Sequence, residues 1–179
     1  MKGVVFTEFL DMVEQAFGLE MQDRIIEKAA LPTNGAYSAV GTYDHGEIVR
    51  LVQCLSAETG KPVADLIQAY GEHLFGRFSE KYPMFFHKPK SCFEFLSSIE
   101  GTIHVEVRKL YPDAELPSFR CEVVNDRHMT MLYESSRPFG DLALGLIIGC
   151  ARHYNEAIAV ARENLSAGGT TRVRFTLTK

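Results

Sequence analysis

The chain has 179 residues, of which 46% are hydrophobic and 23% charged, which is typical of one soluble globular domain. The net charge of -4 argues against nucleic acid as the main partner, because phosphate binding requires a basic surface. Glu8 and Asp11 interrupt the first apolar run, and no segment has the roughly 18 apolar residues of a membrane span. We therefore expect a cytoplasmic protein with no signal peptide and no membrane partner.

The four cysteines lie at Cys54, Cys92, Cys121 and Cys150. None forms a Cys-x-x-Cys pair, and no short spacing between cysteine and histidine indicates a zinc site. We expect buried, reduced thiols.

The first half of the chain has the pattern of a series of helices. Apolar side chains recur at helical spacing between Val4 and Phe17, and Gly18 follows as a stop signal. Similar patterns predict helices over 21–30, 44–59 and 62–78, the second of them beginning at a capping box. The stretch 82–89 is aromatic and interrupted by proline, and it predicts a loop.

The second half changes from a helical to an extended pattern. A capping box at Ser91 and Glu94 begins a helix that is expected to end near Tyr111. Alternating residues between Phe119 and Ser135 then predict a hairpin with its turn at 125–126. The pattern then predicts a helix over about 140–154 and two further strands, over 157–161 and 173–177. The expected fold is α+β, with helices first and then an antiparallel sheet of about four strands.

His104 is the first candidate for chemistry. It lies inside the helix predicted after Ser91, next to the apolar stripe, with Gly101 three residues before it. A glycine inside a helix usually has a packing reason, and clearance for a flat ligand beside the histidine is one such reason. Histidine is a common haem ligand, but a lone helical histidine is more often a hydrogen-bonded core residue.

Tyr133, Ser135 and Arg137 form the second candidate. Residues two apart in an extended chain share a face, so the three side chains are expected to project together. A phenol, a hydroxyl and a guanidinium suit one or two carboxylates, such as the propionates of haem. An exposed polar strand end is the alternative interpretation of the same pattern.

Together these elements resemble the haem nitric oxide/oxygen binding (H-NOX) family, which is related to the sensor domain of soluble guanylate cyclase. The resemblance covers essentially the whole chain. The matching segments are MKGVVFTEFLDMVE at the start, AYGE at 69–72 with Phe78 behind it, KLYP at 109–112, LP at 116–117, Tyr-x-Ser-x-Arg at 133–137 and GLIIG at 145–149. It implies a single haem-binding domain over 1–179, with a helical lobe over about 1–62, a haem-ligating α+β lobe over about 63–179 and the haem between them.

The resemblance also implies roles for individual residues. His104 would be the proximal ligand to the iron of haem b. Pro117 would press on the porphyrin and distort it from planarity. The propionates would be bound by Tyr133, Ser135 and Arg137.

The expected distal pocket consists of Phe9, Leu74, Phe78, Leu142 and Gly145. In oxygen-binding members of the family, a distal tyrosine lies three residues before the first glycine of the Gly-Leu-Ile motif, and that position is Leu142. The positions of an accompanying asparagine and aromatic residue are Leu74 and Phe9. None of these side chains donates a hydrogen bond, which bound oxygen needs far more than nitric oxide does. The resemblance therefore implies a sensor of NO and CO that excludes oxygen.

The resemblance also implies roles for residues outside the proximal and propionate sites. Met1 and Val5 correspond to the part of the family's first helix that approaches the haem. Gly71 corresponds to a hinge glycine, for which ordinary helix packing is the alternative. His73 would enter the distal pocket if the register were shifted by one residue.

The family implies a sensor rather than an enzyme. NO binding would break the bond between iron and His104, the haem would relax against Pro117, and the helical lobe would shift. Because the sequence ends directly after the last strand, we expect the output to act in trans, on a histidine kinase or a cyclic-di-GMP enzyme.

Two other functions remain as alternatives. A haem enzyme, such as a peroxidase or an NO dioxygenase, would need polar distal groups, and Leu74 and Leu142 argue against them. A haem carrier would release its haem, which a Tyr-Ser-Arg clamp disfavours. Some bacterial members bind zinc in a cysteine-rich C-terminal hairpin, but residues 164–170 contain no cysteine, so we expect no zinc.

Overall fold

The computed structural model describes every residue from Met1 to Lys179. In chain order the elements are α1 (Val4–Phe17), α2 (Leu19–Ala29), α3 (His45–Thr59), α4 (Val63–Lys81), a 3-10 helix (Pro83–Phe85), α5 (Cys92–Ser98), a π-helix (Ile99–Ile103), α6 (His104–Leu110), β1 (Ser118–Asn125), β2 (His128–Ser135), α7 (Gly140–His153), β3 (Ala159–Asn164) and β4 (Thr171–Thr178). The predicted α+β fold is confirmed. None of the helices combines the length and the hydropathy of a membrane span. The chain forms two compact units, Met1–Tyr70 and Gly71–Lys179, with the boundary inside α4.

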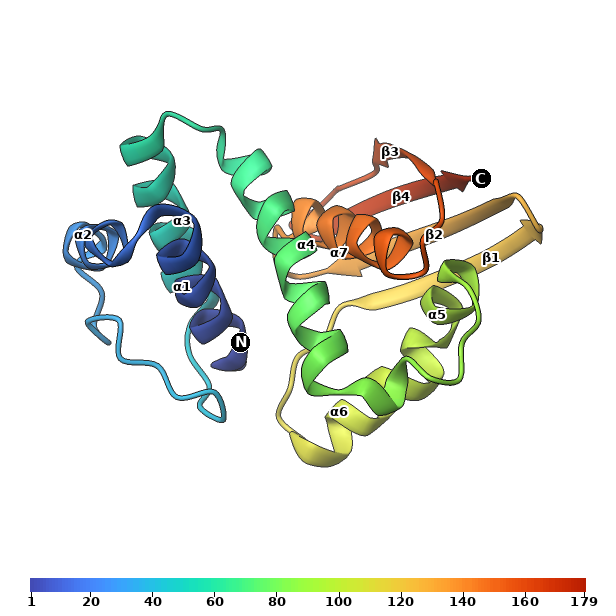
Figure 1. Cartoon of the computed structure of the whole chain (residues 1–179), viewed down its shortest axis with the longest axis horizontal. Helices are drawn as coiled ribbons and strands as arrows, with labels where there is room; N and C mark the ends of the chain where they lie inside the picture. Colours follow the sequence, from blue (N-terminus) through green and yellow to red (C-terminus); the bar gives the residue numbers. More distant parts are fainter. The chain divides into compact units, whose positions relative to one another are not determined.

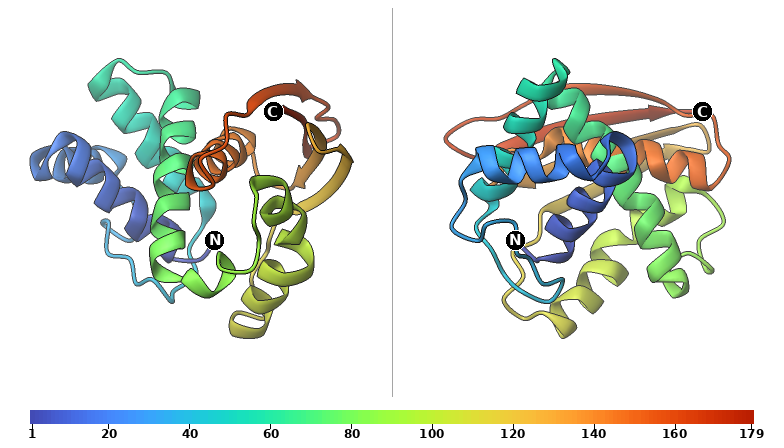
Figure 2. Two further views of the ribbon diagram at one scale, coloured as in Figure 1. Left: turned by 45° about the vertical axis from the view of Figure 1, so that its right-hand side comes forward. Right: turned by 60° about the vertical axis from the view of Figure 1, so that its left-hand side comes forward.

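The first unit is built from α1, α2 and α3, which pack together (blue to teal in Figure 2). The apolar faces predicted from helical spacing supply its core, with Phe6, Val13 and Ile25 fully buried. Gly18 ends α1 as predicted, and its φ of 89° lets the chain turn directly into α2. The predicted N-cap of α3 is also present, since Asp44 Oδ1 accepts a hydrogen bond from the Gly46 N–H at 2.7 Å.

Tyr70 closes the core of this unit from the first half of α4. Its ring packs edge-on against Phe9, with 5.3 Å between ring centroids. Its hydroxyl donates a hydrogen bond to the carbonyl of Val5 in α1. Burial is the main cause that raises the pKa of Tyr70 well above its ordinary value, and the charges of Glu8 and Asp11 add to it.

Replacing Tyr70 with phenylalanine is expected to lower the free energy of unfolding by about 1 kcal/mol near pH 8, because the hydrogen bond to Val5 is lost. Above about pH 10 only the unfolded chain ionises this tyrosine readily, so the wild-type protein loses stability there and the variant is spared this loss. Chemical denaturation at the two pH values measures the effect. The deficit of the variant should shrink at the higher pH, and a constant deficit would contradict the assignment.

The second unit contains one antiparallel sheet in the order β1-β2-β4-β3. The hairpin predicted from alternation is present, with β1 and β2 joined at 126–127. Helix α7 lies against one face of the sheet (Figure 1), and α5 packs between α7 and β1. Every second side chain of β2 and β4 points toward these helices. These apolar side chains are Met129, Met131, Tyr133, Val173, Phe175 and Leu177.

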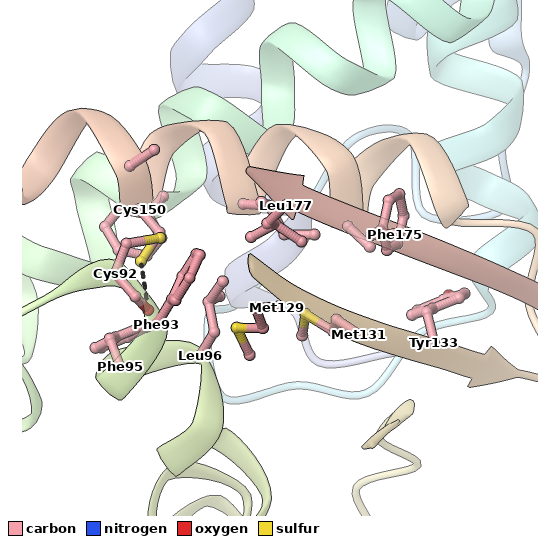
Figure 3. Close-up of a cluster of buried hydrophobic side chains, with 14 of the residues drawn as sticks. Cys92, Phe93, Phe95, Leu96, Met129, Met131, Tyr133, Cys150, Phe175 and Leu177 are labelled. Atoms are coloured by element: carbon pink, nitrogen blue, oxygen red, sulfur yellow. Dashed lines mark hydrogen bonds between the residues drawn. The ribbon is translucent and has the colours of Figure 1, made fainter. Parts of the chain in front are cut away.

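This apolar face and the helices form the core shown in Figure 3. Cross-strand pairs such as Met131 with Phe175 fix the register, because a slip of one residue would turn every apolar side chain outward. Cys92 and Cys150 are fully buried in this core, and all four cysteines are free thiols. Burial raises the pKa of Cys150, with Cys92 beside it adding to the shift, so the thiol stays protonated.

Helices α4 and α7 approach each other through glycines. A Cβ on Gly71 would lie 2.4 Å from the carbonyl oxygen of Leu142 and 2.9 Å from the Cα of Gly145. A Cβ on Gly149 would lie 2.7 Å from the Cβ of Phe75. Both positions therefore require glycine for close packing, which is one of the two roles expected for Gly71; the hinge role stays a prediction.

A matched pair of glycine substitutions tests this close approach. Gly149→Ala is expected to lower the free energy of unfolding by about 1 kcal/mol, because overpacking exceeds the gain in helix propensity. Gly76→Ala, on α4 with nothing within 4 Å of the added Cβ, should instead stabilise by about 0.5–1 kcal/mol. Urea denaturation of both variants gives the comparison, and equal shifts would show that α4 and α7 can move apart freely.

Candidate cofactor site

His104 is the first residue of α6 and follows the π-helix Ile99–Ile103 directly. The sequence predicted one α-helix from Ser91 to Tyr111, and its N-cap is present, since Ser91 Oγ accepts from the Glu94 N–H at 3.2 Å. The π-turn interrupts that helix. It changes which residues face inward: Leu110, whose spacing from Ile103 and Val107 fits the apolar face of a continuous α-helix, is 69% exposed, while His104 is only 7% exposed.

The imidazole of His104 is held by a carboxylate. Its Nδ1 lies 2.9 Å from Oε1 of Glu100, and the same oxygen accepts the Phe119 N–H at 2.9 Å. A carboxylate oxygen that accepts from Nδ1 favours the tautomer of the neutral ring with its proton on Nδ1, which leaves the lone pair on Nε2. Burial lowers the pKa of His104 although Glu100 opposes the shift, which favours the neutral ring that a metal ligand requires.

The structure brings Tyr133, Ser135 and Arg137 together, although not in the way the alternation predicted. Strand β2 ends at Ser135, so Arg137 lies beyond it in a turn. The turn is closed by a 3.1 Å hydrogen bond from the Arg137 N–H to Ser135 Oγ. The Tyr133 hydroxyl lies 3.5 Å from the carbonyl oxygen of Arg137. Tyr133 itself is buried, on the face of the sheet that carries the core (Figure 3).

The guanidinium of Arg137 binds the segment that precedes β1. Its Nη1 donates to the Glu115 carbonyl at 3.0 Å, and its Nη2 forms an ion pair with the Glu115 carboxylate. The Arg137 side chain is 13% exposed, whereas that of Glu115 is 76% exposed. A carboxylate reaching Arg137 from the solvent side is the functional group that a haem propionate would present, so the residues of this cluster fit the cofactor.

Pro117 lies between two fixed points of the chain. Glu115 is bound by Arg137, and the Phe119 N–H is bound by Glu100. The ring of Pro117 is half-buried. It lies in the short segment that is bound at one end by Arg137 and at the other end by Glu100, the partner of His104. This arrangement agrees with the expected contact between Pro117 and a cofactor, although the contact itself stays a prediction.

The expected distal residues of the second unit are apolar side chains on α4 and α7. Leu74 and Gly145 are buried, and Phe78 and Leu142 are half-buried. His73 neighbours Leu74 on α4, and its Nε2 is buried. The side chains of Leu74, Phe78 and Leu142 carry no hydrogen-bond donor, and Gly145 has no side chain.

The remaining expected residues belong to the first unit. Phe9 is buried, and Met1 and Val5 are half-buried. The Met1 ammonium donates to the Tyr43 carbonyl at 2.7 Å, which fixes the start of the chain. Contacts of these residues with a cofactor stay predictions. The structure contains no group of three or more His, Cys, Asp or Glu side chains placed to hold a metal ion, and the expectation about zinc also stays a prediction.

Sequence reasoning missed Glu100 and Glu115. Glu100 is four residues before His104, and this spacing alone could have indicated a contact along a helix. Glu115 had no such signal, because it meets Arg137 only through the fold.

The sequence matches a family model described as Haem-NO-binding over residues 2–162. Curated proteins gave no match. The fold is similar to that of a variant of the Fe(II) unliganded H-NOX protein from K. algicida, with 45% identity, a TM-score of 0.92 and coverage of 100% of this chain and 96% of that chain.

Two other solved structures extend the comparison. H-NOX from Shewanella woodyi, in the Fe(II)CO ligation state, has 38% identity and a TM-score of 0.84, with 100% of this chain and 94% of that chain covered. A mutant of T. Tengcongensis H-NOX has 23% identity and a TM-score of 0.90, covers 99% of this chain and 97% of that chain, and shows the fold alone.

Proposed function

Because this chain belongs to the H-NOX family of haem-binding gas sensor domains, we propose that it binds haem b through His104 and senses NO and CO while excluding oxygen. The observation that carries the proposal is the buried imidazole, whose Nδ1 is held by Glu100 and whose Nε2 is left for a metal. The Shewanella woodyi protein, solved in an Fe(II)CO state, supports CO as a ligand.

Different residues of the second unit are proposed to bind the iron, the propionates and the porphyrin ring. His104 Nε2 is the proposed ligand, and ferrous haem, when bound, supplies the iron at which NO or CO binds. Arg137 and the hydroxyls of Tyr133 and Ser135 would hold the propionates, with a propionate competing against Glu115 for the guanidinium. Pro117 would contact the porphyrin.

Ligand choice is proposed to depend on side chains without donors. Leu74, Phe78, Leu142 and Gly145 offer no hydrogen bond to bound oxygen, which carries partial negative charge. NO and CO depend far less on such a bond. The same lack of polar groups disfavours peroxidase or dioxygenase chemistry, and we propose a sensor rather than an enzyme.

Signalling is proposed to begin at His104. Its displacement from the iron on NO binding would move α6 and, through Glu100 and Phe119, the start of β1 beside Pro117. The output would act in trans on a histidine kinase or a cyclic-di-GMP enzyme.

Removing the arginine of the carboxylate cluster should accelerate haem loss. Arg137→Ala is expected to increase the rate of haem transfer to an excess of apomyoglobin about 10- to 100-fold, the equivalent of one charge-assisted hydrogen bond. Arg120→Ala is the control, because this arginine is 77% exposed on β1 and pairs with Glu134. Equal rates in the two variants would remove Arg137 from the haem site.

Anaerobic titration tests the function as a whole. The ferrous protein should bind one equivalent of NO or CO per chain, release haem slowly and show no peroxide turnover. Rapid haem release would favour a carrier, and sustained peroxide turnover would favour a haem enzyme; either result would overturn the proposal.

A further inference from the structure

Glu100 has a more constrained position than a surface carboxylate normally has. Its Oε1 accepts two hydrogen bonds at 2.9 Å, one from the His104 ring and one from the Phe119 backbone. The side chain is only 34% exposed, and Oε2 lies 3.9 Å from the Arg108 guanidinium. The carboxylate is thus fixed from three directions.

The contact between Glu100 and His104 arises within one segment of the chain. Glu100 lies in the π-helix Ile99–Ile103, and His104 follows it four residues later. The spacing of four residues places the carboxylate beside Nδ1 of the imidazole, while the Phe119 N–H approaches from the start of β1. The sequence separation between Glu100 and Phe119 makes this a tertiary contact rather than a local cap.

We propose that Glu100 is a positioning residue that fixes the Nδ1–H tautomer of His104, directs Nε2 toward the iron and increases the electron donation of the ring. A hydrogen bond from a ligating histidine to a carboxylate orients the ring and raises its basicity. The inference rests on the proposed function, because it requires His104 to be the iron ligand. Glu100 also connects His104 to the start of β1, because the same carboxylate oxygen binds the Phe119 N–H close to Pro117.

Two substitutions separate charge from geometry. Glu100→Gln keeps an oxygen that can accept from both His104 and Phe119 but removes the negative charge. Glu106→Gln is the matched control: it removes an equal charge two residues beyond His104, from a side chain bonded to Lys109 at 2.7 Å. Circular dichroism verifies that both variants keep their helices.

Resonance Raman spectra of the ferrous, unliganded holoproteins and their reduction potentials provide the readout. Glu100→Gln should shift the Fe–His stretching band to lower frequency and the potential to a more positive value, whereas Glu106→Gln should match the wild type. A band and a potential in Glu100→Gln that equal those of Glu106→Gln would overturn the role of Glu100. Absence of an Fe–His band from the wild type would instead overturn the ligation by His104, and this inference with it.

Discussion

His104→Ala is expected to lose the histidine-ligated haem that we propose for the wild-type protein. The buried imidazole follows the π-helix Ile99–Ile103 directly, is held through Nδ1 by Glu100 and has the lone pair of Nε2 available to iron. Substitutions of residues that merely support a metal ligand cost about 10- to 100-fold in affinity, and removal of the ligand itself should exceed this range. Haem titration of the apoprotein measures the affinity, and the absorption spectrum reports the ligation.

Imidazole added to His104→Ala provides an internal check. The small molecule can enter the space left by the side chain and restore the histidine-type spectrum. His87→Ala is the control variant, because His87 is exposed in the loop before α5 and should leave haem binding unchanged. Wild-type affinity and spectrum in His104→Ala without imidazole would show that another residue ligates the iron.

Leu142→Tyr is expected to increase oxygen affinity about 10- to 100-fold, because a phenol could donate a hydrogen bond worth roughly 1.5–3 kcal/mol to the partly charged ligand. Leu142 is half-buried on α7, one turn before Gly145. CO affinity should change much less, since CO gains little from a donor. The ratio of oxygen to CO affinity in the ferrous protein is therefore the quantity to measure.

Leu142→Phe separates the hydroxyl from the ring. This variant adds nearly the same volume without a donor, so its oxygen affinity should stay at the wild-type level. An increase in Leu142→Phe equal to that in Leu142→Tyr would mean that shape, rather than hydrogen bonding, controls oxygen binding. No increase in either variant would place Leu142 outside the distal pocket.

Much of the fold was predictable because its signals are local. Gly18 ends α1, Asp44 and Ser91 cap their helices, and alternation with a turn near Asn125 predicts the β1–β2 hairpin. Each of these features depends on a few neighbouring residues. The order β1-β2-β4-β3 depends instead on which apolar faces meet across the core, and the sequence pattern alone did not establish it.

The local geometry of the candidate site was not predictable from the sequence. Leu96, Ile99, Ile103, Val107 and Leu110 follow α-helical spacing, so nothing in the pattern indicated the π-turn that leaves Leu110 exposed. The extended pattern likewise placed Arg137 on a strand that ends two residues earlier. In both cases the unpredicted conformation is accompanied by a tertiary contact that the sequence pattern does not reveal: Glu100 with Phe119, and Arg137 with Glu115.

Exposure of the reduced protein to air tests the central claim most directly. The ferrous protein is prepared without oxygen, the excess reductant is removed, and absorption spectra are recorded before and after air is admitted, with NO and CO added to separate samples. We predict that NO and CO each shift the spectrum at once, while air leaves the unliganded ferrous spectrum in place. A stable new spectrum in air, reversed by removing oxygen, would contradict an NO sensor that excludes oxygen.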